Sequence, residues 1–315
     1  MYCDRRVAAE LLALLQPGRA LSWLLPTLRA QEGWHVQTRR QAGGPASGSL
    51  QVYCGRTSPL SLSLRQGRLR LEAHPTYAAL APALFAETFD EGGLAARGDD
   101  LRAYLQAITC KADRIFLDGE ARLHAGLMRR YGLLAPADAP FLALDAELKI
   151  GFVNKAAQRA ATQAVIDQIH LPAREEVPTK LDALGVDRAG RLLLIEVKQD
   201  PRGLDRAGWQ AAAHCARFAA LEAHQPDWVR TTLASLAGDK ARVGLLGEGW
   251  APPWTHPTVW VPVLAAADPQ PDWARRWSAA LAPVIRASQG ALQGLELWRL
   301  GPEGQRLEVF TPAQG

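Results

Sequence analysis

Residues 180–199 have the sequence KLDALGVDRAGRLLLIEVKQ, in which two apolar runs flank a short polar linker. The runs cover 181–187 and 191–198, and the linker supplies Asp and Gly, which suit a tight hairpin loop. A loop centred on residue 189 pairs positions whose numbers sum to about 378. This register predicts that Asp182 lies opposite Glu196 on the neighbouring strand.

The second run is apolar on both faces until its last residues. Side chains alternate between the two faces of a strand, so Leu192 and Leu194 share the face of Glu196, and the intervening residues take the other. An apolar character on both faces is typical of a strand buried between layers. Glu196 and Lys198 therefore place charge at the end of a buried strand, which is costly unless the charges are paired or bind a metal.

Directly opposed carboxylates, with Cβ atoms about 5 Å apart, repel each other unless a cation lies between them. Asp182 and Glu196, with the Val197 carbonyl, offer the hard oxygen ligands that Mg²⁺ or Mn²⁺ prefers. The sequence thus predicts a divalent-metal site, with Lys198 beside it. The alternative is an ordinary hairpin that ends in a solvated Glu/Lys pair.

The type of cation at position 198 is informative. The chain has only six lysines among its 36 basic residues, so arginine is its usual cation. An ammonium is a compact point charge that can lose its proton, whereas a guanidinium is planar and permanently charged. A lysine at position 198 therefore favours a chemical role.

The quoted stretch, together with a following helix that begins DRAGWQ, resembles the core of the PD-(D/E)XK nuclease superfamily. The resemblance covers about 180–222. Asp182, Glu196 and Lys198 match the motif residues, and Gln210 matches a glutamine that some branches carry on the helix. Two positions depart from the pattern, because no proline precedes Asp182 and His214 stands where a tyrosine is common.

The resemblance implies a restriction-endonuclease-like αβββαβ core that uses Mg²⁺ to cut nucleic acid, DNA more often than RNA. It also implies an acidic residue from the helix before the first core strand. That residue is Glu120 if the helix is 117–131, or Asp167 if it is 154–169, and Glu120 is slightly favoured. Glu175 and Glu176 are further alternatives. Gln210, His214 and Arg217 share one helical face and could reach a phosphate or water near the metal.

The rest of the chain predicts an α/β protein with three parts. These are an N-terminal α+β region of unknown role (1–135), the nuclease-like core (136–265), and a C-terminal helix and β-hairpin extension (266–315). In the first part, alternation predicts strands at 34–40, 48–54 and 59–72, followed by helices at 76–90, 98–109 and 117–131.

Composition bounds the function. The 315 residues carry a net charge of +4, which neither requires nor excludes a polyanionic partner. The four cysteines lack metal-ligand or disulfide spacing, which predicts a reducing cytoplasm, and no apolar run is long enough for a membrane span. Eight of ten tryptophans follow residue 208, where core packing is commoner than base stacking.

We therefore expect a cytoplasmic, Mg²⁺- or Mn²⁺-dependent nuclease. The alternatives are a nucleic-acid or nucleotide-binding module that does not cleave, and a hydrolase of another small phosphate substrate. The oligomeric state is open, with a homodimer among the alternatives.

Overall fold

The computed structural model describes most of the chain. The described residues are 8–31, 34–40, 48–54, 57–112, 119–132, 135–149, 152, 154–169, 180–199, 204–224, 233–234, 237–238, 240–241, 246, 250, 259–269, 271–288 and 292–310. The fold is mixed α/β with two sheets, and the chain divides into two compact units. The N-terminal unit contains Asp4–Ala137 and Ser235–Pro252, and the C-terminal unit contains Asp138–Ala234 and Pro253–Gly315.

The N-terminal unit is built on an antiparallel sheet with the order β1-β2-β3-β4-β5. The strands are Trp34–Arg40 (β1), Gly48–Cys54 (β2), Thr57–Arg65 (β3), Arg68–Glu72 (β4) and Thr88–Phe89 (β5). The predicted run at 59–72 is therefore two strands, joined at Gln66 and Gly67, which both have positive φ angles. Two consecutive residues with positive φ angles form the tight turn of a hairpin.

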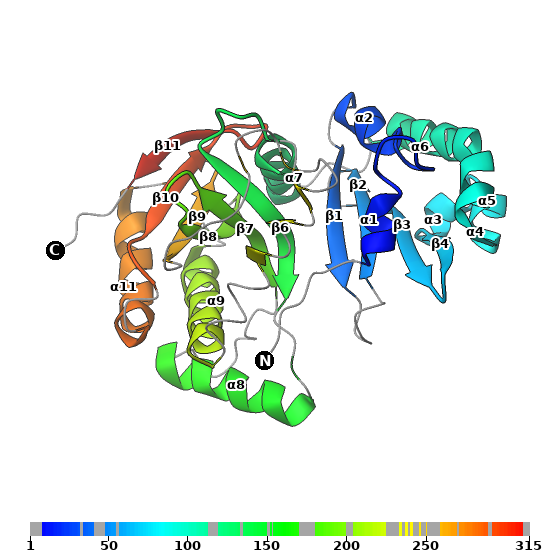
Figure 1. Ribbon diagram of the computed structural model, residues 1–315. Helices are drawn as coiled ribbons and strands as arrows, with labels where there is room; N and C mark the ends of the chain where they lie inside the picture. Colours follow the sequence, from blue (N-terminus) through cyan, green and yellow to red (C-terminus); the bar gives the residue numbers. More distant parts are fainter. Residues whose placement is uncertain are drawn as a thin grey trace. The chain divides into compact units, whose positions relative to one another are not determined.

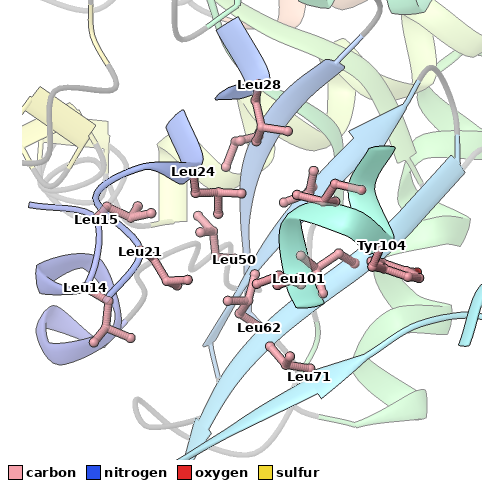
Figure 2. Close-up of a cluster of buried hydrophobic side chains, with 14 of the residues drawn as sticks. Leu14, Leu15, Leu21, Leu24, Leu28, Leu50, Leu62, Leu71, Leu101 and Tyr104 are labelled. Carbon is pink, nitrogen blue, oxygen red and sulfur yellow. The ribbon is translucent and has the colours of Figure 1, made fainter. Parts of the chain in front are cut away.

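Short helices cover one face of this sheet, and leucines fill the space between. The helices of the unit are Ala9–Ala13 (α1), Leu24–Arg29 (α2), Pro75–Ala78 (α3), Pro82–Ala86 (α4), Glu91–Ala96 (α5), Gly98–Ala112 (α6) and Gly119–Tyr131 (α7). Figure 2 shows part of the core, where Leu50, Leu62 and Leu71 of three strands meet Leu101 and Tyr104 of α6. The single helix predicted at 76–90 is wrong, because Pro82 begins a new helix instead.

The C-terminal unit contains a mixed sheet with the order β11-β10-β9-β8-β7-β6 (Figure 1). Its strands are Phe141–Lys149 (β6), Lys180–Asp187 (β7), Leu192–Lys198 (β8), Trp260–Ala266 (β9), Glu296–Leu300 (β10) and Arg306–Phe310 (β11). Strands β6, β7 and β8 form an antiparallel meander, and β9 lies parallel to β8. The predicted C-terminal hairpin forms, and its first strand extends the same sheet because β10 pairs in parallel with β9.

Three helices, Lys155–Ile169 (α8), Leu204–His224 (α9) and Pro271–Ala287 (α11), contact one another in this unit (Figure 1). Helix α9 connects β8 to the parallel strand β9 and contacts both. Such a crossover lays its helix over the sheet. Strand β6 comes before α8 and pairs with β7, so 141–149 is the first strand of the meander and α8 is inserted after it.

The described tryptophans of the chain's last third lie in the interior. They are Trp250, Trp260, Trp273, Trp277 and Trp298. The packing interpretation is thereby confirmed for these five, which present no exposed ring for base stacking. Among the described helices, none has both the length and the apolar character that a membrane crossing requires.

Candidate functional site

The hairpin formed by β7 and β8 has the predicted register. Ala183 lies opposite Ile195 and Val186 opposite Leu192, so Asp182 and Glu196 are the next two residues beyond the last backbone pair. Asp187 closes the loop, since its Oδ1 accepts hydrogen bonds from the backbone N–H groups of Ala189 and Arg191, both at 2.9 Å. The loop therefore fixes which residues meet at the other end of the hairpin.

Three charged side chains meet at that other end. The Nζ atom of Lys198 lies 2.8 Å from Oε1 of Glu196 and 3.8 Å from Oδ2 of Asp182. The same Oδ2 accepts a hydrogen bond of 2.8 Å from the backbone N–H of Val197. One ammonium thus interacts with both carboxylates, which is the compensation that two opposed carboxylates require.

Burial distinguishes the two carboxylates. Glu196 is only 4% exposed, whereas the side chain of Asp182 is 29% exposed and that of Lys198 is 11% exposed. The alternative of a solvated Glu/Lys pair is therefore wrong for Glu196. The cluster is buried at Glu196 and reaches solvent at Asp182.

His214 of α9 lies against Glu196 on the helix side of the cluster. Its Nε2 atom is 3.8 Å from Oε2 of Glu196, and the residue is 3% exposed. Burial, with the positive charges of Arg217 and Lys198, lowers the pKa of His214 to about 3, even though a hydrogen bond to the Lys180 backbone raises it. His214 is therefore neutral at physiological pH.

Two further residues of this helical face have different surroundings. Gln210 is half-buried, one turn before His214. Arg217 is buried, and its Nη2 donates a hydrogen bond of 3.2 Å to Oγ1 of Thr162 on α8. Burial lowers the pKa of Arg217 from its usual value. The face therefore combines an amide, a neutral imidazole and a cation.

Two acidic residues of β6 also lie near this end of the sheet, and the motif did not indicate them. Asp145 is buried and lies opposite Leu184, on the face of the sheet that carries Asp182. Glu147 lies opposite Asp182 by the same register, has a φ angle of 48°, and forms an ion pair of 3.6 Å with Lys180. Two acidic residues at alternate positions of one predicted strand were the sequence pattern that could have indicated them. An irregularity in pairing between Ala143 and Asp145 sets their register.

The structure describes the surroundings of the two candidates for an extra acidic ligand. Asp167 is exposed on α8, where its Oδ1 accepts a hydrogen bond of 2.8 Å from Nε2 of Gln163. Glu120 is half-buried in the first turn of α7, in the N-terminal unit. Glu175 and Glu176 lie outside the described residues.

The donor set fits a hard divalent cation. Asp182 and Glu196 provide carboxylate oxygens, and Val197, between Glu196 and Lys198 in the sequence, provides a backbone carbonyl. Within the part of the chain that the structure describes, no three His, Cys, Asp or Glu side chains are gathered closely enough to form a ready cage. Water or substrate oxygens would therefore supply the other ligands, as is usual for Mg²⁺.

The N-terminal unit has a separate hollow of about 430 Å³ lined by Arg19, Trp23, Glu91 and Arg102, among other residues. Arg19 pairs with Glu91 at 2.6 Å, and Arg102 pairs with Asp99 at 2.5 Å while lying over the ring of Trp23. Each of these arginines is neutralised by an acid of the same hollow. Its charges therefore do not select an anionic ligand.

Comparisons with models of protein families, with curated proteins and with solved structures find no match to this chain. Its function is therefore inferred from the residues of the site.

Proposed function

We propose that the protein is a metal-dependent nuclease that hydrolyses phosphodiester bonds of nucleic acid, with DNA as the favoured substrate. The observation that carries the proposal is the position of the Lys198 ammonium, 2.8 Å from buried Glu196 and 3.8 Å from Asp182. This set of charges contains a buried carboxylate, an opposed carboxylate and a lysine. Such a set suits hydrolysis of a phosphodiester, whereas its net contribution to the stability of the fold is small. Replacing a buried ion pair by apolar residues is often neutral or stabilising, so stability alone is a weak reason for it.

The order of elements around the site supports this proposal. An antiparallel meander (β6, β7, β8) is followed by helix α9 and then by a strand parallel to β8. This βββαβ order is the one expected of the restriction-endonuclease-like core that the resemblance implies. Of the residues that match the motif, Asp182 lies on β7, Glu196 and Lys198 lie at the end of β8, and Gln210 lies on the crossover helix.

Each residue has a role that follows from its position. Asp182, Glu196 and the Val197 carbonyl would hold Mg²⁺ or Mn²⁺, which when bound polarises the phosphodiester and lowers the pKa of water. Lys198 positions the attacking water and stabilises negative charge that develops on the phosphate. Gln210, half-buried on α9 one turn before His214, would hydrogen bond to water or phosphate from the helix side.

The difference in solvent exposure among the three charged side chains indicates the side from which a substrate would approach. Asp182 is the most exposed of the three charged residues and Glu196 the least. A phosphodiester would therefore approach from the Asp182 side, with Glu196 behind it. The more exposed carboxylate is also the one fixed by a backbone N–H, at Val197.

The test is cleavage of supercoiled, linear double-stranded and single-stranded DNA, and of single-stranded RNA, in Mg²⁺, Mn²⁺ or EDTA. We expect metal-dependent cleavage by the wild type and losses of at least about 100-fold in Lys198→Ala and Asp182→Ala. Arg276→Ala is the matched control, because Arg276 pairs with Asp272 on an exposed part of α11. Equal rates in all four proteins would overturn the assignment of the site.

The same experiment distinguishes the non-cleaving alternative. Filter binding or fluorescence anisotropy on the same substrates measures association apart from turnover. Nucleic-acid binding by the wild type with no metal-dependent cleavage on any substrate would indicate a binding module instead of a nuclease.

A further inference from the structure

His214 and Glu196 make an unusual pair. The imidazole Nε2 and the carboxylate Oε2 are 3.8 Å apart, which is longer than a hydrogen bond, and both residues are at least nine-tenths buried. Nε2 of His214 is buried and has no hydrogen-bond partner within the described structure. A buried polar atom left in this state is costly unless another group satisfies it.

The other ring nitrogen fixes what Nε2 presents. His214 forms a hydrogen bond with the backbone of Lys180, and this bond raises the pKa of His214. The imidazole is therefore the donor and the Lys180 carbonyl is the acceptor. Since Nε2 has no hydrogen bond, the donor is Nδ1–H. Nε2 of the neutral ring then directs a lone pair toward Oε2 of Glu196, and two acceptors face each other.

A cation between these acceptors would satisfy the unpartnered Nε2 of His214. Two bonds of about 2.1 Å reach at most about 4.2 Å, so atoms 3.8 Å apart are within the span of one ion. Hydrogen bonding of the distal nitrogen to a carbonyl is also the usual arrangement of a ligating histidine.

We infer that His214 binds, through Nε2, the same divalent ion as Glu196, and that the site therefore prefers Mn²⁺, Co²⁺ or Zn²⁺ to Mg²⁺. The inference rests on the proposed function, whose metal it specifies. Imidazole nitrogen suits these transition ions, whereas Mg²⁺ favours oxygen ligands alone. His214 stands where the resembling family often has a tyrosine, and the substitution supplies the nitrogen donor.

The test measures metal binding directly in the full chain, stripped with EDTA and dialysed. Isothermal titration calorimetry with Mn²⁺, Co²⁺ and Mg²⁺ gives affinities, and pulsed EPR of bound Mn²⁺ detects coupling to nitrogen. We expect nitrogen coupling in the wild type and its loss in His214→Asn. We expect affinity for Mn²⁺ and Co²⁺ to fall by about 10-fold or more in this variant, and affinity for Mg²⁺ by less than about threefold.

Cys215→Ala is the matched control, because Cys215 is the next residue of α9, equally buried, and not part of the proposed site. Absence of nitrogen coupling in wild-type Mn²⁺ protein overturns the inference, even if His214→Asn fails to fold. Unchanged Mn²⁺ affinity in a folded His214→Asn, checked by circular dichroism, also overturns it. So does an imidazolium signal for His214 at pH 7 in ¹⁵N NMR.

The outcomes separate the two proposals. Nitrogen coupling without cleavage of any nucleic acid would contradict the proposed function and leave the ligand assignment intact. Cleavage that depends on Lys198 but shows no nitrogen coupling would leave the nuclease intact and remove His214 from the metal.

Discussion

The Nζ atom of Lys198 lies 2.8 Å from Oε1 of Glu196, two positions earlier on the same strand. Both side chains leave the same face of β8, so the strand itself fixes the distance between their backbones. Glu196 is buried there, and its charge depends on the lysine for compensation.

Removal of the ammonium should therefore destabilise the fold as well as stop the proposed cleavage. We expect Lys198→Met to lower the free energy of unfolding by about 3 kcal/mol, because it leaves a buried carboxylate without its cation. Urea unfolding monitored by circular dichroism measures this. The double variant Glu196→Gln, Lys198→Met should recover most of the loss, whereas Arg276→Ala, which breaks an exposed pair, should change stability by less than about 0.5 kcal/mol. A Lys198→Met protein as stable as the wild type would contradict this account of the pair.

The two aspartates of β7 should separate function from stability. Asp182→Asn keeps an oxygen for the Val197 N–H, so we expect loss of cleavage and metal binding with a stability change below about 1 kcal/mol. Asp187→Ala removes the acceptor of two loop N–H groups and should cost about 1–2 kcal/mol while cleavage persists. Calorimetric metal titration and urea unfolding of both variants are the measurements. The opposite pattern would place the functional end of the hairpin at the loop.

The hairpin loop depends on a backbone conformation at Gly190, whose φ angle is 79°. A Cβ atom added there meets no other atom within 4 Å, so any effect of alanine comes from the backbone alone. We expect Gly190→Ala to cost about 1 kcal/mol, and Gly190→Asn less, since asparagine tolerates the left-handed region better. Thermal and urea unfolding test the ranking, and a stabilising alanine would refute it.

The buried imidazole gives the stability a pH dependence. Burial, with the charges of Arg217 and Lys198, lowers the folded-state pKa of His214 to about 3, whereas a free imidazole has a pKa of about 6.5. Between these values the unfolded chain binds the extra proton, so stability falls as the pH falls from 6.5 toward 3. This group contributes a slope of up to about 1.4 kcal/mol per pH unit.

Urea unfolding at pH 7.5, 6.0 and 5.0, in EDTA to remove metal, measures that slope. We expect the wild type to lose more stability than His214→Asn between pH 6.0 and 5.0, with Cys215→Ala following the wild type. Parallel profiles for wild type and His214→Asn would show that His214 takes up no proton on unfolding.

The hairpin was predictable because its pattern is local. Alternation placed Glu196 and Lys198 on one face, and the loop at Gly190 set the pairing of Ala183 with Ile195. The pairing of β10 with β9 was not predictable, since it joins segments that are distant in the chain. The burial of Glu196 by His214 also depends on how α9 lies over the sheet, which helical periodicity alone does not specify.

The acids of β6 show the same limit. The position of Asp145 and Glu147 beside β7 depends on the pairing irregularity that precedes Asp145 and on the positive φ angle of Glu147. The alternation of apolar and polar residues along the strand predicts neither feature. The division of the 76–90 segment was readable from Pro82, whose ring does not fit a helix interior.

Strand β8 has neighbours along both edges, antiparallel β7 on one side and parallel β9 on the other. Glu196 and Lys198 are paired with Leu264 and Ala266 of β9, and on the β7 side the backbone N–H of Val197 between them is held by the Asp182 carboxylate. In the proposed nuclease the reacting groups would be preorganised when the chain folds, and a substrate would not need to supply energy to assemble them. The strand is thus a fixed frame, on which changes of substrate preference can evolve through the surrounding side chains and loops while the charged end of β8 stays the same.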